Sequence, residues 1–410
     1  KGNELTSSQL NFDSLNSLRV NYDVRMRIMH ISTRLILGGS QENTILSCEG
    51  QAQAGNDVAL VFGPIYGPEG SLRDRAQKHG GIELIETPNL VRQLAPIRDF
   101  RCYRDLKKLI QAWKPDVVHT HSSKAGIIGR AAAWKLGVPC VIHTIHGLPF
   151  HPYEKAWRNA IYIASERWAA KRCHRIVCVA HAMRDQALAK GIGQKDQFVT
   201  VYSGMEVETY ISPEKERDVV RSELGISPED YVIGTVSRLA QHKGHDDVLD
   251  ALGRELQGNP SMKLLWVGDG WWREKLENRI REMGIEKQVV LTGLVQPETI
   301  ANYIAAMDVL LHPSYREGLP RTVVQAMLGG KPVVAHDVDG TREVCIPEKT
   351  GYLIGVGDHK ALRNAVLDLL GNREKRITLG SAGRDLCTEQ FSASNMVQAL
   401  DELYREVLVR

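Results

Sequence analysis

Arg238 and Lys243, in the segment SRLAQHKGHD, are the residue pair with the clearest chemical meaning. An apolar run that predicts a β-strand ends just before Arg238, and Gly244 and a helical stretch follow Lys243. A guanidinium fork and a compact ammonium can hold a diphosphate and stabilise the charge that develops when it leaves. The start of the following helix also favours phosphate. We therefore interpret the pair as an anion site rather than as two solvated loop charges.

Glu317 opens the segment EGLPRTVVQ, which runs from a predicted strand end into a helix. Its carboxylate can accept hydrogen bonds from sugar hydroxyls, and the backbone N–H groups of Gly318 and Leu319 can donate to a ligand. The residues alone are equally consistent with a carboxylate that only stabilises the start of the helix. Both interpretations stay open at this point.

The segment Gly38-Gly39-Ser40 follows the first predicted strand and opens the next helix. Glycines let backbone N–H groups approach an anion closely, and a helix start adds a favourable dipole. Two glycines also suit an ordinary turn. The pattern is not G-x-G-x-x-G, so a dinucleotide-binding dehydrogenase is disfavoured.

His119, His121 and His146 lie at the ends of two successive predicted strands. Three histidines suggest a metal site, but no carboxylate accompanies them at ligand spacing. Contact of one or two of them with substrate is the better hypothesis, and buried structural histidines are the alternative.

The stretch from Tyr153 to Arg175 is locally basic and predicts a helix. Trp157, Ile161 and Trp168 fall on one face of that helix, together with Ala164. A basic helix with tryptophans can lie in a membrane interface. A face of this kind more often packs against its own sheet, which is the interpretation we favour from the sequence.

The candidate residues follow predicted strands, so they can form one site only in a fold that brings the ends of those strands close together. Near-continuous apolar runs alternate with helical stretches from residue 27 onward, which predicts parallel sheets covered on both faces. The alternation stops near residues 204–228 and then resumes, so we expect two doubly wound domains, 26–205 and 206–390. Residues 391–410 are expected to form a helix that crosses back to the first domain. In such sheets ligands bind beyond the carboxyl ends of the strands.

Composition sets further limits. The 410 residues suit two α/β domains, and a net charge of +3 gives no argument for a nucleic-acid partner. The seven cysteines are scattered without a Cys-x-x-Cys motif, so we expect neither disulfides nor zinc, and a reducing cytoplasm. No run approaches the roughly 20 apolar residues of a spanning helix. Residues 1–25 are expected to be a polar, poorly ordered extension.

Taken together, these segments resemble the retaining family-4 glycosyltransferases of the GT-B fold, over roughly residues 26–408. The resemblance rests on the Gly-Gly loop, HTHSSKAGIIGRAAA, TIHGLPF, VYSGMEVETY, VSRLAQHKGHD, VGDGWWREKLE and LHPSYREGLPRTVVQAMLGGKPVV. It implies two Rossmann-like domains facing across a cleft. The acceptor would bind mainly the first domain and a nucleotide diphosphate-sugar mainly the second.

The resemblance also assigns roles. Arg238 and Lys243 would hold the diphosphate, Glu317 the hydroxyls of the donor sugar, and His146 would stand near the reacting sugar. Where the family usually has a second glutamate that grips the ribose, this chain has Gln325. The remaining expected contacts are Gly39, Ser40, Gly268, Val295, Gly318 and Leu319 on the donor side, and His121 and Lys124 on the acceptor side.

The function implied is retaining transfer of a hexose-type sugar, UDP-sugars being favoured as donors. The acceptor would be a polyprenyl-linked glycan in cell-surface polysaccharide synthesis, reached from the inner face of the cell membrane. No metal or other cofactor is expected, because cationic side chains neutralise the diphosphate. A nucleotide-sugar epimerase of the same fold remains an alternative, and so does a non-catalytic nucleotide-sugar-binding subunit, which the Gln325 departure suggests.

Overall fold

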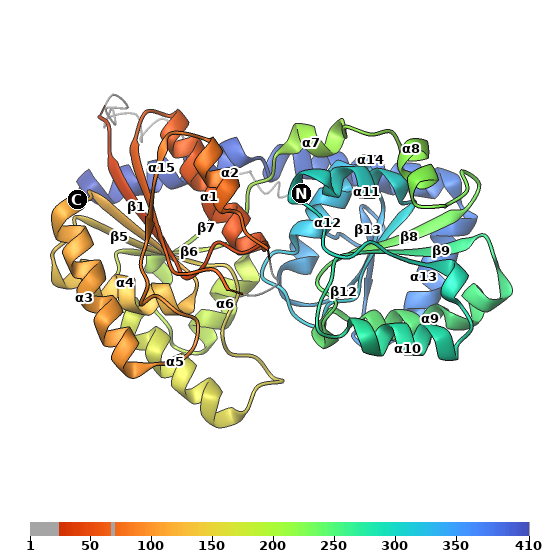
Figure 1. The fold of residues 1–410 in the computed structure, drawn as a ribbon, viewed down its shortest axis with the longest axis horizontal. Coiled ribbons are helices and arrows are strands. Elements are labelled where there is room, and N and C mark those ends of the chain that lie inside the picture. Colours follow the sequence, from red (N-terminus) through yellow and green to blue (C-terminus); the bar gives the residue numbers. More distant parts are fainter. Residues whose placement is uncertain (1–23, 67–69, 410) are drawn as a thin grey trace, which may run out of the picture.

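The structure is a computed structural model that describes residues 24–66 and 70–409. It consists of two α/β domains side by side (Figure 1). The expectation of a disordered extension at residues 1–25 falls almost wholly outside the described residues.

The first domain is a seven-stranded parallel sheet of order β3-β2-β1-β4-β5-β6-β7. Its strands are β1 (Arg27–Ser32), β2 (Asp57–Phe62), β3 (Ile82–Glu86), β4 (Val117–His121), β5 (Cys140–Ile145), β6 (Arg175–Cys178) and β7 (Phe198–Thr200). Its helices are α1 (Gly39–Gln53), α2 (Arg73–Lys78), α3 (Pro96–Trp113), α4 (Ser123–Lys135), α5 (Ala156–Ala170) and α6 (His181–Ala189). Strands β1, β2, β4 and β5 are almost wholly buried, as the apolar runs predict.

The second domain is a six-stranded parallel sheet of order β10-β9-β8-β11-β12-β13. Its strands are β8 (Tyr231–Val236), β9 (Met262–Val267), β10 (Val289–Leu291), β11 (Val309–His312), β12 (Val333–His336) and β13 (Gly351–Ile354). Its helices are α7 (Val207–Ile211), α8 (Arg217–Glu223), α9 (His245–Gly258), α10 (Arg273–Glu282), α11 (Ile300–Ala306), α12 (Arg321–Leu328), α13 (His359–Gly371) and α14 (Arg373–Gln390). The polar stretch 204–228 thus contains two short helices.

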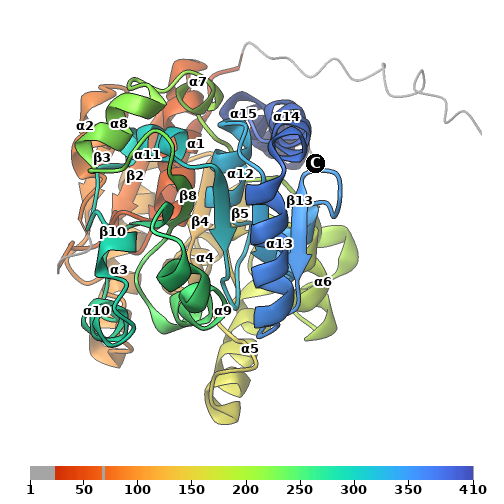
Figure 2. The same cartoon turned by 90° about the vertical axis from the view of Figure 1, so that its right-hand side faces the viewer.

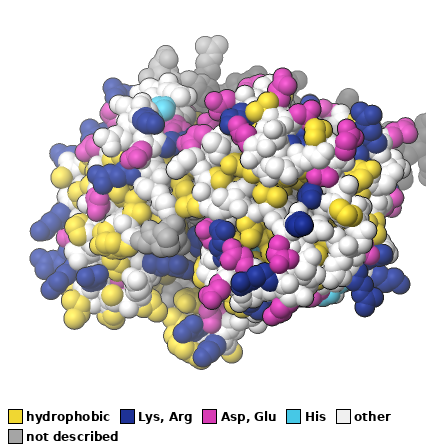
Figure 3. Space-filling view, turned by 45° about the vertical axis from the view of Figure 1, so that its right-hand side comes forward, with side chains coloured by type: hydrophobic (Ala, Val, Ile, Leu, Met, Phe, Trp, Pro, Cys, Tyr) yellow, Lys and Arg dark blue, Asp and Glu magenta, His cyan; other side chains and the backbone are white. Residues whose placement is uncertain are grey.

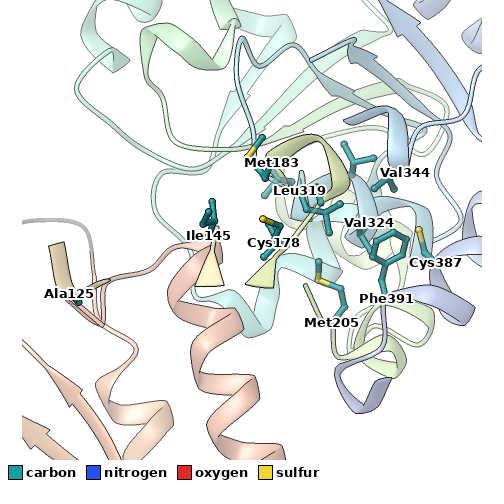
Figure 4. Packing of buried hydrophobic residues seen from close by; sticks show 14 of the residues in the cluster. Ala125, Ile145, Cys178, Met183, Met205, Leu319, Val324, Val344, Cys387 and Phe391 are labelled. Carbon is teal, nitrogen blue, oxygen red and sulfur yellow. The ribbon is translucent and has the colours of Figure 1, made fainter. Parts of the chain in front are cut away.

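The chain passes between the domains twice, and the two passages are hydrogen-bonded to each other. Met205 N–H donates to the carbonyl of Phe391 at 2.8 Å, and Ala393 N–H donates to the carbonyl of Met205 at 2.9 Å. The domains also share a hydrophobic cluster: Cys178 and Met183 of the first lie near Leu319 and others of the second (Figure 4).

After the second passage, helix α15 (Ala393–Val409) lies along the first domain (Figures 1 and 2). Its Leu400 and Tyr404 are buried in a cluster with Ile28, Val117 and Cys140 of the first sheet. The second domain is therefore followed by a helix that belongs, by its packing, to the first.

The strand order reverses between β1 and β4 in one sheet and between β8 and β11 in the other. Loops that follow neighbouring strands diverge at such a switch point and leave a crevice for ligands. In each domain, the crevice opens toward the cleft that separates the domains.

Within residues 24–66 and 70–409, no helix combines the length and the apolar character needed to cross a membrane. All seven cysteines are buried as free thiols.

Candidate active site

A cavity of about 1120 Å³ lies between the domains and takes its walls from both. Most residues expected to bind ligands line it: Gly39, Ser40, His146, Arg238, Lys243, Gly268, Val295, Glu317, Gly318, Leu319 and Gln325. In the first domain they come from the start of α1 and from the end of β5, and in the second domain from the loops after β8, β9, β10 and β11 and from α12. The fold thus gathers these eleven positions at one cleft.

At the base of the cavity, Glu317 is held by two side chains. Lys243 Nζ contacts its Oε1, and His312 Nε2 donates to the same oxygen at 3.1 Å. Burial raises the pKa of Glu317, but the charge of Lys243 and the hydrogen bond from His312 outweigh it and hold the pKa well below its usual range. Glu317 is therefore an ionised hydrogen-bond acceptor.

Glu317 does not cap α12, because that helix begins four residues later, at Arg321, and has no side-chain cap. Of the two interpretations that the sequence left open for Glu317, the structure therefore does not support the helix-capping one. The backbone N–H of Glu317 donates to Asp339 Oδ2 at 2.7 Å, which fixes the loop after β11. A carboxylate held this firmly keeps its orientation before a ligand arrives.

Lys243 ends a short 3₁₀ turn, and Gly244 follows it as the N-cap of α9. Gly244 has φ of +73°, and an added Cβ would lie 2.0 Å from the carbonyl oxygen of Pro313. Only glycine suits this position, which places the start of a helix directly beside the lysine. Arg238 lies on the neighbouring side of the cavity, with its guanidinium 5.7 Å from the ring of Trp271.

Arg321, which also lines the cavity, connects the two domains. Its Nη1 donates to the carbonyl of Gly204 at 2.8 Å, and its Nη2 pairs with Glu42 of α1 at 3.1 Å. An added Cβ on Gly39 would lie 2.7 Å from Cδ of Arg321, so the glycine loop and α12 touch across the cleft. This residue was not predicted from the sequence. A cation in the first turn of a helix opposes the helix dipole, and that mismatch was the available signal.

Gln325 is buried on α12 with its Oε1 free of hydrogen bonds to other described residues. Gln325 is among the residues that line the cavity, so a ligand hydroxyl that reaches the amide can supply the missing donor.

His146 lines the cavity, and its Nε2 lies 3.0 Å from Nδ1 of His121. His121 itself is fully buried behind it and does not line the cavity. Lys124 is also set back, paired with Asp99 at 2.6 Å. The structure therefore brings neither of the two residues assigned to the acceptor side into the cavity wall.

The predicted apolar face of the basic helix is exposed, so the expectation that it packs against its own sheet is wrong. Trp157 is 59% exposed, Ile161 50% and Trp168 44%. The buried residues of α5 are instead Glu166, Ala169 and Ala170, and Glu166 forms an ion pair with the fully buried Arg130. The helix is thus anchored by its opposite, smaller face.

Two family models match the chain in tandem. The model described as glycosyl transferase 4-like domain matches residues 38–204, and the model described as glycosyl transferases group 1 matches residues 216–386. The chain belongs to the family-4 glycosyltransferases of the GT-B fold.

Curated relatives of this glycosyltransferase include the UDP-Gal:alpha-D-GlcNAc-diphosphoundecaprenol alpha-1,3-galactosyltransferase of Escherichia coli, 26% identical over 94% of this chain and 98% of the relative. The capsular polysaccharide biosynthesis glycosyltransferase CapM of Staphylococcus aureus is 23% identical over 80% of this chain and 88% of its own length. Among solved structures, HepE of Anabaena in complex with UDP-glucose has a TM-score of 0.80 at 20% identity, covering 93% of this chain and all of that one.

Several buried histidines of the first domain have a pKa that keeps their rings neutral. Burial lowers the pKa of His30 to about 4, and burial with the charge of Arg321 lowers that of His146 to about 3. Burial also holds the pKa of His119, His121 and His143 well below the ordinary value.

We therefore expect stability to fall on mild acidification. The unfolded chain takes up protons at its histidines near pH 6.5, whereas the folded protein resists protonation down to about pH 4, so the unfolded state gains as pH falls through this window. Each histidine that stays neutral in the folded protein lowers the unfolding free energy at pH 5.5 by about 1.4 kcal/mol, relative to a pH at which the unfolded chain is also neutral at that residue. Urea unfolding at pH 7.5, 6.5 and 5.5 measures this, and His143→Gln should make the dependence shallower. An unfolding free energy that is flat over this range would contradict the prediction.

Proposed function

We propose that the glycosyltransferase moves a hexose-type sugar from a UDP-sugar to a hydroxyl of a polyprenyl-diphosphate-linked glycan, with retention at the anomeric carbon. The observation that carries the proposal is the grouping of Arg238, Lys243 and the ionised Glu317 at strand ends that face the first domain. Two cations suit a diphosphate, and a fixed carboxylate suits the hydroxyls of the sugar attached to it.

The relatives support the substrate classes. The E. coli relative is named for a UDP-galactose donor and a diphosphoundecaprenol-linked acceptor, and the similarity spans nearly the full length of both chains. The HepE structures contain UDP, UDP with glucose, or UDP-glucose. We therefore propose a UDP-hexose as the donor and a lipid-linked glycan as the acceptor of this chain.

The carboxylates of the cleft favour a mechanism without a covalent sugar–enzyme intermediate. Glu42, Glu166, Asp269 and Glu317 line the cavity, and each is paired with a basic side chain. A carboxylate engaged in this way is a poor nucleophile. In the proposed step the acceptor oxygen attacks the anomeric carbon from the side that the diphosphate leaves, and the departing phosphate oxygen takes the acceptor's proton. Arg238 and Lys243 stabilise the leaving charge, so we propose that no metal is needed.

We further propose that the first domain rests on an anionic membrane while it takes its acceptor. The exposed aromatic residues of α5 stand among Lys155, Arg158 and Arg167, and α3 begins with exposed Ile97 and Phe100. Both helices follow strands of the same parallel sheet and start at its carboxyl edge, beside the cleft. Helix α5 projects from the domain in both ribbon views (Figures 1 and 2). In the space-filling view, basic and apolar side chains intermingle along the lower edge of the molecule (Figure 3).

Arg238→Ala and Lys243→Ala should each reduce transfer by about 100-fold or more. Loss of one preorganised partner of a developing charge costs about 3 to 4 kcal/mol of transition-state stabilisation. The assay follows radiolabelled sugar from UDP-galactose or UDP-glucose to a synthetic GlcNAc-diphospho-lipid, with EDTA present, and NMR of the product gives the anomeric configuration. Unchanged turnover in both variants would remove the diphosphate assignment, and an inverted product would remove retention. Conversion of the donor without any acceptor would instead favour the epimerase.

Gln325→Glu should tighten UDP-sugar binding by about 1 kcal/mol or less, because a charged acceptor hydrogen-bonds a ribose hydroxyl more strongly than a neutral one. The unliganded variant should be less stable than the parent, since the new charge is buried without a partner. Calorimetric titration measures the affinity for UDP-sugar, and thermal unfolding measures the stability. Glu317→Gln serves as the comparison: because Glu317 is placed near the reacting sugar, this variant should strongly reduce turnover. A parent that transfers nothing, together with a Gln325→Glu variant that does, would make this chain a binding subunit.

Flotation with anionic liposomes should recover the protein at low salt and release it at high salt, as electrostatic attraction to the headgroups requires. Trp157→Ala should weaken recovery, because the exposed ring no longer enters the interface. Ile377→Ala removes a comparably exposed side chain from α14 of the second domain and is the matched control. Negligible recovery at both salt concentrations would contradict a membrane-resting surface.

A further inference from the structure

A continuous chain of buried hydrogen bonds runs from the cavity wall to α15. His146 Nε2 lies 3.0 Å from His121 Nδ1, His121 Nε2 lies 2.9 Å from His30 Nδ1, and His30 Nε2 lies 2.7 Å from Gln51 Oε1. The amide of Gln51 continues to the hydroxyl of Tyr404 at 3.3 Å. Apart from His146 at the cavity, every member of the chain is buried.

The chain has a direction, which the amide sets. Gln51 Nε2 donates to Tyr404, so its Oε1 faces His30 and accepts a proton from His30 Nε2. A neutral imidazole carries one N–H, so His30 Nδ1 must accept from His121 Nε2. By the same reasoning His121 Nδ1 accepts from His146 Nε2. The proton of His146 is thus on Nε2, and its Nδ1 is the nitrogen with a lone pair.

A buried metal is a poorer account of the same residues. His30, His119 and His121 come close enough to be considered as ligands. Two nitrogens bound to one tetrahedral zinc lie about 3.3 Å apart, given Zn–N bonds of about 2.0–2.1 Å. The 2.9 Å between His30 and His121 is a hydrogen-bond distance, and both nitrogens of His119 face hydroxyls, Tyr404 on one side and Thr144 at 2.6 Å on the other.

We propose that Gln51, His30 and His121 are positioning residues that hold His146 in the Nε2–H tautomer, so that Nδ1 serves as a preset hydrogen-bond acceptor at the reacting end of the cleft. The ligand chemistry this implies is a hydroxyl, of the donor sugar or of the acceptor, that donates to Nδ1. The lowered pKa of each histidine agrees with neutral rings throughout the chain. The catalytic part of the inference rests on the proposed transfer function.

The first measurement needs no activity. Long-range ¹H–¹⁵N spectra of histidine-labelled protein distinguish the two tautomers, and His146→Gln identifies the signals of His146. We expect the Nε2–H pattern for His146 in the unmodified chain. His121→Asn places an oxygen near the position of Nδ1 and should keep this pattern, whereas His121→Leu should lose it. An Nδ1–H pattern in the unmodified protein would overturn the proposal.

Kinetics then test the consequence. His121→Leu should lower kcat by about tenfold or more with little change in the KM for UDP-sugar, and His121→Asn should restore kcat to within about threefold. Gln51→Leu, which acts from the far end of the chain, should lower kcat in the same sense. Folded His121→Leu protein, verified by circular dichroism, with unchanged kcat and tautomer would refute the positioning role. If no variant or parent transfers sugar but the tautomer pattern holds, the proposed function fails and the structural assignment stands.

Discussion

The ion pair between Lys243 and Glu317 is the interaction on which the arrangement of the cleft depends. It joins the loop after β8 to the loop after β11, the two central strands at the switch point of the second sheet. A buried carboxylate without a cation is strongly unfavourable, and removing one partner of such a pair leaves an uncompensated charge. The two loops are therefore bound to each other, and the start of α9 is held beside them through Gly244.

The same physical demand sets how the domains meet. Arg321 is nearly buried and must be neutralised, and its partners Glu42 and Gly204 come from the first domain and the passage between domains. Because α12 also carries Gln325, and the loop before it carries Glu317, the ion pair with Glu42 couples the orientation of the first domain to the donor side of the cleft. The same charged contacts of Arg321 therefore influence both the placement of the domains and the geometry of the donor side.

Much of this was predictable from the residues, and the exceptions have physical reasons. Buried parallel strands read as unbroken apolar runs, so β1, β2, β4 and β5 were evident from the sequence, whereas β3, β7 and β13, which are only partly buried, were not. Strand ends gathered the site residues because parallel topology requires it. Contacts such as Arg321 with Glu42 link distant segments through tertiary placement alone. The environment of the apolar face of α5 was predicted wrongly, because a row of apolar residues on a helix does not indicate whether that face packs against the protein's own sheet or is exposed.

The return of α15 to the first domain has a consequence beyond packing. Its Tyr404 is buried in the first domain, where the hydroxyl contacts Gln51 and His119. A phenol hydroxyl buried in an apolar layer needs partners, and these two supply them. The amide of Gln51 thereby acquires a fixed orientation. Through the chain of hydrogen bonds, this orientation also sets which nitrogen of His30, His121 and His146 carries the proton. A helix that follows the second domain in sequence thus orders side chains of the first domain that lead to the cavity both domains share.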